Sequence, residues 1–200
     1  MYVHLMTETR RYTQRKRAAD REETRLRIVE ATMALHEEIG PSATTISAIA
    51  QRAGVQRLTV YRHFPDETAV FAACTSHWLE LNPPPDPAGW ASLEAGQRQA
   101  HAALVAFYRY YRDTQRMWRT AISDEPKVPA LQGPMESFRQ QLNALGEAIG
   151  KGFGGTADSL PTATLRHALA FTTWASLDEQ GFDDEAMADL VMDWLRGLRN

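Results

Sequence analysis

The sequence predicts an all-α fold, with an N-terminal three-helix head containing a helix-turn-helix and a larger C-terminal helical domain. Apolar residues recur at three- and four-residue intervals through most of the chain. A small-residue turn separates two short helical segments near the N-terminus, and Gly or Pro punctuates the helical segments. With 200 residues and 44% hydrophobic content, the chain can bury a core of its own.

Residues 1–21 are expected to form a flexible basic arm. The arm carries Arg10, Arg11, Arg15, Lys16 and Arg17. Arginines on such an arm suit the narrow minor groove of A·T-rich DNA, so we expect the arm to become ordered on binding. The alternative interpretation is a disordered, solubilising tail.

Two helices follow the arm. An amphipathic stripe over residues 22–39 predicts the first, which Gly40 and Pro41 end. In "TTISAIAQRAG", Thr44 or Thr45 can cap a short second helix, and Gly54 tolerates the positive φ needed at its end.

A third helix over "QRLTVYRHF" turns Leu58 or Val60 inward and ends before Pro65. Two short helices joined by a Gly-containing turn form a helix-turn-helix, whose second helix enters a DNA major groove. The outward positions expected to reach DNA are Gln56, Arg57, Thr59, Tyr61, Arg62 and His63. Arg can pair with guanine and Gln with adenine, whereas Thr, Tyr and His most often contact phosphates. The alternative is a helical hairpin that packs on protein.

The charge distribution favours a polyanionic partner for the head. Residues 1–64 contain 11 Lys and Arg against 7 Asp and Glu, whereas residues 65–200 contain 11 against 18. A basic head on an acidic body indicates phosphate neutralisation. A solvated charged arm is the alternative.

The C-terminal part reads as further helices. One is predicted over 66–81, before the stiff connector "NPPPDPAGW", and a long helix or kinked pair over 90–122. Another ends near residue 150, where 150–155 match G-x-G-x-x-G; this pattern follows a helix instead of a strand, so we interpret it as a loop.

The last two predicted helices are "PTATLRHALAFTTWASLDEQG" and "DDEAMADLVMDWLRGL". They carry more apolar surface than an exposed hairpin should, and two such hairpins can pair as a four-helix bundle. The expected dimer-interface residues are Leu165, Leu169, Thr172, Ser176, Leu190, Val191, Trp194, Leu195 and Leu198. A two-fold dimer predicts a palindromic DNA site.

The sequence does not lead us to expect a secreted protein, a membrane protein or an enzyme. The single Cys74 cannot form an internal disulfide, and no apolar run is long enough for a signal peptide or membrane span, so a cytoplasmic location is expected. "HEEIG" lacks the second His of a zinc-protease helix, and no catalytic constellation is present. We expect no enzyme activity, no cofactor and no metal site.

Residues 24–71 resemble the N-terminal domain of TetR-type transcriptional regulators. The resemblance is carried by Thr44-Thr45, Ala53-Gly54-Val55 and the Tyr-x-His-Phe-Pro run at 61–65. After the arm at 1–21, it implies an all-helical homodimer with a DNA-binding domain at 22–66 and a ligand-binding and dimerisation domain at 67–200, with the 66–81 helix as connector. By position, it implies that Thr45 contacts a phosphate, Arg57 and Thr59 lie in the groove, and Tyr61 and His63 contact the DNA backbone.

The chain departs from the family pattern at Gln56, Leu58 and Glu67. Leu58 can touch a thymine methyl or simply pack, and Glu67 replaces a phosphate-binding Lys. These departures motivate the alternative function, a small-molecule binding protein whose DNA-binding head is weakened or lost.

The resemblance also implies a ligand pocket in the C-terminal domain. Its expected lining is Trp78, His101, Leu104, Phe107, Tyr108, Tyr111, Trp118, Phe138, Leu142, Phe171 and Trp174. The expected function is a ligand-responsive transcriptional repressor that binds a palindromic operator on double-stranded DNA as a homodimer. A small apolar or aromatic effector would release it.

Overall fold

The computed structural model describes residues 2–198, with side chains from residue 14 onward, and in that range it contains helices and no strand. The all-α prediction is therefore confirmed. The residues cluster into two units, Met1–Leu81 and Asn82–Asn200, which we call the head unit and the body unit.

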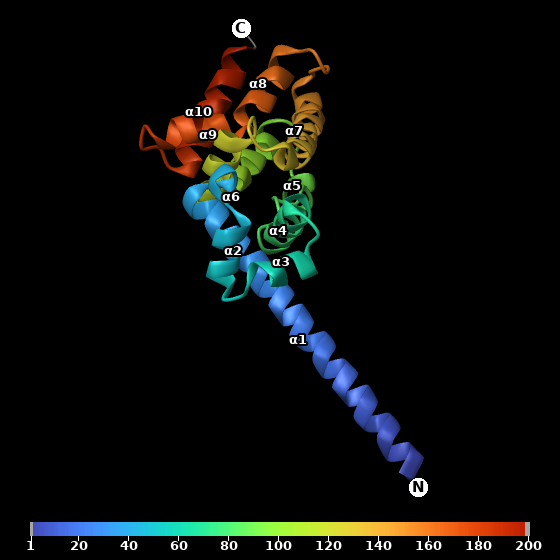
Figure 1. Cartoon of the computed structure of the whole chain (residues 1–200). Coiled ribbons are helices and arrows are strands. Elements are labelled where there is room, and N and C mark those ends of the chain that lie inside the picture. The colour runs from blue at the N-terminus through green and yellow to red at the C-terminus, as the bar shows by residue number, and fades with distance from the viewer. Residues whose placement is uncertain (1, 199–200) are drawn as a thin grey trace. The chain divides into compact units, whose positions relative to one another are not determined.

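The first helix is much longer than predicted. α1 (Tyr2–Ile39) continues through the segment expected to be a flexible arm, and Figure 1 shows it running past α2 and α3. No Gly or Pro interrupts residues 2–39, and the Arg, Lys, Ala and Glu residues there favour helix. The expected helix start at residue 22 is wrong because nothing in the sequence stops the helix earlier. Gly40, with φ 83°, and Pro41 end it as predicted.

Three further helices complete the head unit after a 3-10 turn at Pro41–Ala43: α2 (Ile46–Ala53), α3 (Arg57–His63) and α4 (Glu67–Leu81). Each helix contributes to one core, whose most buried members are Ile28, Val29, Ile49, Val60 and Val70. The 66–81 helix, predicted as part of the C-terminal domain, clusters with the head unit because its buried face packs on α1. There the Cys74 Sγ lies 3.7 Å from His36 Nδ1.

The body unit begins after the proline-rich segment 82–87. A short α5 (Ala88–Ala91) precedes α6 (Gln97–Asp124), so the expected helix from residue 90 starts later, after Gly96 with φ 92°. α7 (Pro129–Gly150) follows and ends in a 3-10 turn at Lys151–Phe153.

The glycine-rich segment 150–155 has a packing role. It follows helix α7, and a Cβ on Gly96 would lie 2.7 Å from the Gly152 carbonyl oxygen. The backbones at Gly96 and Gly152 therefore approach too closely for side chains. This close approach accounts for the glycines at positions 96 and 152.

The segment expected as one helix over 161–181 is broken in two. α8 (Leu160–Ala168) and α9 (Phe171–Asp178) are separated at Leu169 and Ala170. The Tyr108 hydroxyl donates to the Ala168 carbonyl at 3.0 Å, and the Tyr111 hydroxyl donates to the Leu169 carbonyl at 2.8 Å. Two tyrosines of α6 thus hydrogen-bond the carbonyls at the break. α10 (Asp184–Gly197) then starts at Asp183, whose side chain accepts the Ala186 N–H at 2.8 Å.

Candidate nucleic-acid interface

The turn between α2 and α3 is fixed by backbone hydrogen bonds. The Thr45 side chain caps α2 by accepting the Ala48 N–H at 3.2 Å. At the other end Gly54 adopts φ 66°, its N–H donates to the Gln51 carbonyl at 3.2 Å, and the Val55 N–H donates to the Ala50 carbonyl at 2.9 Å. This paired arrangement is a Schellman motif, which sets the direction in which the chain leaves α2.

α3 presents most of its side chains to solvent. Val60 is fully buried and anchors the helix to the head core. The exposed side chains are Gln56, Arg57, Leu58, Tyr61 and Arg62, with Thr59 and His63 partly buried. The structure thus brings together all the α3 residues predicted to reach DNA.

Leu58 is 66% exposed, which argues against the interpretation that it packs in the head core. Glu67 is exposed in the first turn of α4, where a carboxylate interacts favourably with the helix dipole. The Arg62 guanidinium donates to the Thr59 hydroxyl at 2.9 Å, so these two side chains restrain each other on the outer face of α3.

The end of α3 lies in a cationic environment. Partial burial, followed by the positive charges of Arg21, Arg62 and Arg25, lowers the pKa of His63. The Arg25 guanidinium lies 5.1 Å from the centre of the Phe64 ring. Arginines of α1 therefore share a surface with α3, and sequence reasoning missed Arg21 and Arg25. Their four-residue spacing from Arg17 was the available signal.

The structure separates the other predicted DNA-contact residues. Thr45 is exposed, but Thr44 is buried and its hydroxyl donates to the Gly40 carbonyl at 2.8 Å, so we correct its role to a structural one. Arg15, Lys16 and Arg17 are exposed on α1. The side chains of Arg10 and Arg11 lie outside the described residues.

One arginine of the head has an internal role. Arg52 of α2 donates from Nη1 to the Glu38 carboxylate of α1 at 2.9 Å. The hydrogen bond and charge of Glu38 raise the pKa of Arg52. Arg52 therefore links α2 to α1 instead of being left for a nucleic acid.

The residues predicted to line a ligand pocket form a dense aromatic cluster in the body unit. Tyr111 is fully buried, and its ring centre lies 5.8 Å from Trp118, 5.4 Å from Phe171 and 6.1 Å from Trp174. Phe107 and Phe138 join the same cluster, while Leu104, Tyr108 and Leu142 are buried in the body unit. The rings of this cluster pack directly against one another. The hydroxyls of Tyr108 and Tyr111 are hydrogen-bonded to backbone carbonyls.

One buried polar group in this cluster lacks a hydrogen-bond partner among the described residues. Trp174 is fully buried, and its indole Nε1–H has no hydrogen-bond partner among the described residues. A buried donor without an acceptor costs about 1–3 kcal/mol. Such a group would gain from a ligand acceptor.

The two remaining pocket residues lie elsewhere. Trp78 belongs to the head unit, where it is buried on α4. His101 lies at the body surface, with Nε2 3.2 Å from Asp189 and 3.8 Å from Glu185. It borders an open hollow of about 420 Å³ between α6 and α10, which Leu93 and Met192 also line.

The predicted dimer residues divide into two groups. Leu165, Leu169, Val191 and Leu195 are at most 1% exposed, so their assignment to an interface is wrong. They form the interior of the body unit because α8 and α10 pack their apolar faces within the chain. The residues that remain available at the surface are Thr172, Ser176, Leu190, Trp194 and Leu198.

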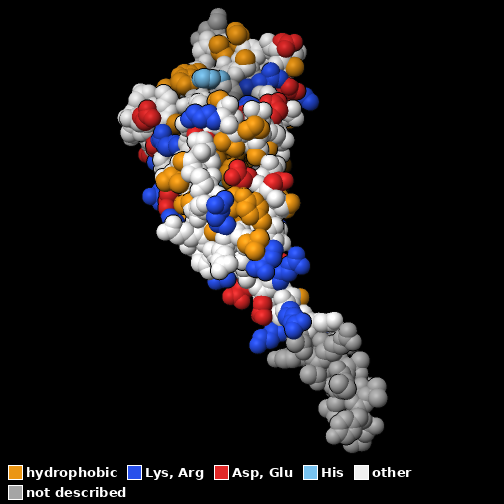
Figure 2. Space-filling model, viewed as in Figure 1, with side chains coloured by type: hydrophobic (Ala, Val, Ile, Leu, Met, Phe, Trp, Pro, Cys, Tyr) orange, Lys and Arg blue, Asp and Glu red, His pale blue; other side chains and the backbone are white. Residues whose placement is uncertain are grey.

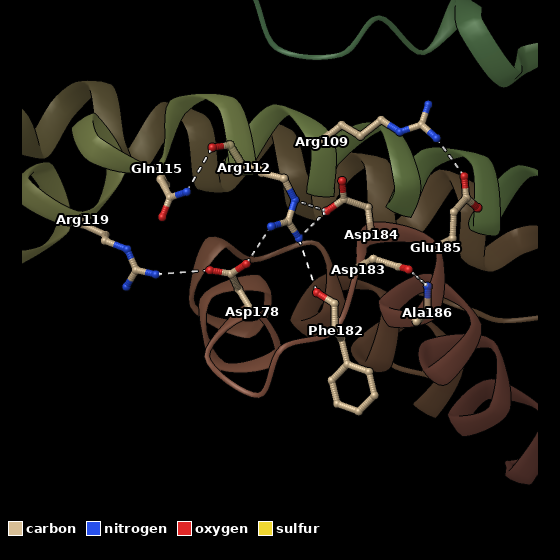
Figure 3. Close-up of polar contacts among 10 residues, drawn as sticks. All are labelled: Arg109, Arg112, Gln115, Arg119, Asp178, Phe182, Asp183, Asp184, Glu185 and Ala186. Atoms are coloured by element: carbon tan, nitrogen blue, oxygen red, sulfur yellow. Dashed lines mark hydrogen bonds and ion pairs between the residues drawn. The ribbon is translucent and has the colours of Figure 1, made fainter.

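An ion-pair network fixes α6 to the start of α10 (Figure 3). Arg112 donates to Asp178 at 2.9 Å and to Asp184 at 3.0 Å, and its Nη2 reaches the Phe182 carbonyl at 3.4 Å. Arg109 pairs with Glu185 at 2.8 Å. The acidic partners lie some 70 positions after the arginines in the sequence, so helical periodicity cannot identify them.

Three further features bear on functions other than DNA binding: the Cys74 thiol, metal ligands and membrane-spanning helices. Burial raises the pKa of the Cys74 thiol to about 12, which disfavours the reactive thiolate. Among the side chains described, no group of His, Cys, Asp and Glu could hold a metal ion. No helix within residues 2–198 is long and apolar enough to cross a membrane.

Comparisons with known proteins agree with this geometry. The family described as "Bacterial regulatory proteins, tetR family" matches residues 28–74, which include α2 and α3. The tetracycline repressor protein class A from transposon 1721 of Escherichia coli is 30% identical over 164 residues, which cover 80% of this chain and 68% of the relative.

One further relative matches only part of this chain, whereas one solved structure matches most of it. The HTH-type transcriptional regulator SrpR of Pseudomonas putida is 43% identical over 75 residues, 36% of this chain but only 35% of the relative. A TetR-like transcriptional regulator from Rhodococcus sp. RHA1 superposes with a TM-score of 0.64 at 21% identity, covering 90% of this chain and 96% of that one. The structural likeness extends over both units.

Proposed function

The chain belongs to the TetR family of bacterial regulatory proteins, and from this premise we propose that it is a ligand-controlled repressor. Members of this family are transcriptional regulators that bind DNA through a helix-turn-helix, and they are not enzymes. We further propose that the protein binds a palindromic operator as a homodimer in the bacterial cytoplasm. A small apolar or aromatic effector would release it.

The observation that carries the proposal is the outer face of α3. A helix held by one buried valine, with Gln56, Arg57 and Arg62 exposed, presents donors suited to base edges and phosphates. We assign Arg57 to a guanine and Gln56 to an adenine. Leu58, exposed between them, would contact a thymine methyl.

Phosphate contacts would fix the position of α3 on the duplex. We assign these contacts to Thr45, Thr59, Tyr61 and His63. Thr45 and Tyr61 are exposed, and Thr59 and His63 are partly exposed. Hydroxyl and imidazole groups commonly bind the DNA backbone without reading sequence.

The proposed dimer would use α9 and α10. Trp194 of α10 is 38% exposed and Leu198, the C-cap of α10, is 39% exposed, which is a high exposure for neighbouring apolar side chains. Two copies related by a two-fold axis would present two α3 helices about 34–36 Å apart, the spacing of successive major grooves. Such a dimer would read a palindromic operator.

The effector site would lie in the aromatic cluster of the body unit. An aromatic molecule with one hydrogen-bond acceptor would stack among rings such as Phe171 and accept the Trp174 Nε1–H. Binding would require the cluster to open. A coupling free energy of about 1–3 kcal/mol between effector and operator would change operator affinity by about 5–150-fold.

Fluorescence anisotropy of a labelled duplex carrying a selected operator tests the DNA-binding part. Arg57→Ala should cost about 1–3 kcal/mol on the operator and relax specificity at one base pair in each half-site. Arg98→Ala, which removes an exposed arginine of the body unit, is the matched control and should leave the affinity unchanged. Equal losses in both variants, or no loss in either, would contradict the assignment of α3 as the reading helix.

The same anisotropy assay tests effector control. A panel of small planar aromatic compounds is added to the complex, and at least one compound should lower operator affinity by fivefold or more. Trp174→Phe should weaken release by that compound, because a phenyl ring remains for stacking while the pyrrole part of the indole, with its N–H, is lost. Release that is equal in the wild type and in Trp174→Phe would place the effector elsewhere.

A further inference from the structure

The face of α1 that packs in the head core continues beyond it as a basic stripe. Ile28, Thr32 and Leu35 face the other helices of the head unit and are at most 6% exposed. One and two turns before Ile28, the same side of α1 carries Arg25 and Arg21, and Arg17 lies a further turn away. We call Arg17, Arg21 and Arg25 the α1 stripe.

The α1 stripe is separated from the acidic residues of the same helix. At about 100° per residue, its three arginines span an arc of about 80°. Asp20, Glu22 and Glu23 project outside this arc. The Arg25 guanidinium lies 3.6 Å from the Glu22 carboxylate. Arg17 and Arg21 form no ion pair with the described residues.

The α1 stripe joins the end of the recognition helix. The Arg25 guanidinium covers the Phe64 ring, which directly follows α3. Arg21 and Arg25 also lie close enough to His63 for their charges to lower its pKa, in addition to its partial burial. Figure 2 shows basic side chains, with acidic ones among them, along the part of α1 above the residues drawn in grey. Basic side chains therefore continue from the end of α3 onto α1, with the Glu22 carboxylate beside them.

The buried part of this face of α1 packs against apolar side chains, whereas the arginines of the α1 stripe need an anionic partner. Arginines side by side repel one another, and phosphates relieve this repulsion while releasing counterions. A duplex placed against α3 supplies phosphates in the neighbourhood of the stripe. Arg25 and Arg17 are eight residues apart, which is about 12 Å of helix, or about three to four base-pair steps along the duplex axis.

We propose that the α1 stripe binds phosphates of the duplex that flanks each operator half-site, and that it does so as a helix. This inference rests on the proposed operator binding by α3. It differs from the expected arm in the minor groove, because phosphate contacts do not depend on base composition whereas arginines in a minor groove favour A·T-rich DNA. The stripe would lengthen the footprint without adding sequence specificity.

The experiment compares two forms of the selected operator with the full-length protein. One duplex ends at the half-sites, and the other extends about six base pairs beyond each of them, with A·T-rich and G·C-rich versions of the extension. The readout is the ratio of the affinities for the extended and short duplexes at several salt concentrations. A general loss of binding cancels in this ratio.

Arg21→Gln and Arg17→Gln are the test variants, and Arg27→Gln on another side of α1 is the control. The wild type should prefer the extended duplex equally for both base compositions. Each test variant should reduce the salt dependence on the extended duplex by a slope of about 1 per head, or about 2 in a dimer, and lower the affinity ratio. Arg27→Gln should keep the wild-type ratio.

Three results would overturn the inference. They are a ratio of one for the wild type, equal effects of Arg21→Gln and Arg27→Gln, and preference for the A·T-rich extension alone. Each of these three results can be obtained only if the wild type binds the short operator selectively. Absence of any selective binding by the wild type would instead refute the proposed function, so the two failures can be told apart.

Discussion

The tyrosines at the α8–α9 break provide the most direct test of how the body unit is held together. Tyr108 and Tyr111 are fully buried, and each donates to one carbonyl at the break. Replacing either tyrosine by Phe keeps the ring and removes only the hydroxyl. The corresponding carbonyl at Ala168 or Leu169 then loses a buried donor.

The expected cost follows from that loss. A buried acceptor left without its partner costs about 1–3 kcal/mol, and no cavity term is added because the ring remains. For a chain of this length each kcal/mol lowers Tm by about 2–4 °C. Tyr110→Phe is the matched control: its hydroxyl lies beside the Trp118 indole and holds no carbonyl of the break, so its removal should cost less than about 1 kcal/mol.

Urea unfolding followed by circular dichroism measures all three variants. Tyr108→Phe and Tyr111→Phe should each lose about 1–3 kcal/mol with an unchanged m-value. If Tyr110→Phe is as destabilised as the other two, ring packing and not the hydroxyl bonds stabilises the break, and the reasoning is refuted.

Three further predictions concern local stability. Gly54→Ala should destabilise the head unit by about 1 kcal/mol, because φ is 66° although no atom lies within 4 Å of the added Cβ, whereas Gly197→Ala at the end of α10, also with open space, should be neutral or stabilising by thermal unfolding. Asp183→Ala should cost about 0.5–2 kcal/mol in urea unfolding by removing the α10 cap, and Asp193→Ala on the exposed face of α10 should cost less than that. Burial raises the pKa of Tyr108 and Tyr111, and it raises the pKa of Tyr110 to about 12. The contribution of these tyrosines to the free energy of unfolding is therefore complete below about pH 10, and it is lost as pH rises toward their folded-state pKa values. Unfolding free energy measured across this range should fall by up to about 1.4 kcal/mol per pH unit for each tyrosine, and a flat profile would show that they ionise as freely as in the unfolded chain.

The helix-turn-helix was predictable because its signals are local. Thr45 at a cap, Gly54 at positive φ and Pro65 after α3 each constrain only their immediate neighbours. Residues that act through sequence-near contacts can be read directly from the chain. The predicted bounds of α2 and α3 agree with the structure.

The length of α1 was missed because charge was interpreted as flexibility. Residues 2–21 contain many Arg and Lys residues but no helix breaker, so composition suggested an arm where helix propensity favours continuation. The exposed side chains of Arg17 and Arg21 fit either interpretation. Only the position of α1 against α3 brings the stripe and His63 together.

The errors in the body unit share one physical cause, which is that periodicity identifies an apolar face but not its partner. Leu165 and Val191 lie on apolar faces that pack inside the unit instead of against a second copy. The break at Ala168 and Leu169 depends on hydroxyls from Tyr108 and Tyr111, about 60 residues earlier.

Selection from a random duplex library by the purified full-length protein, at moderate salt and followed by sequencing, tests the central claim most directly. The account predicts a palindromic consensus with half-site centres about one helical turn of DNA, or a multiple of it, apart. It also predicts that Arg57→Ala loses selectivity at one base pair in each half-site. An unenriched library, with binding only at low salt, would contradict the claim that α3 reads an operator.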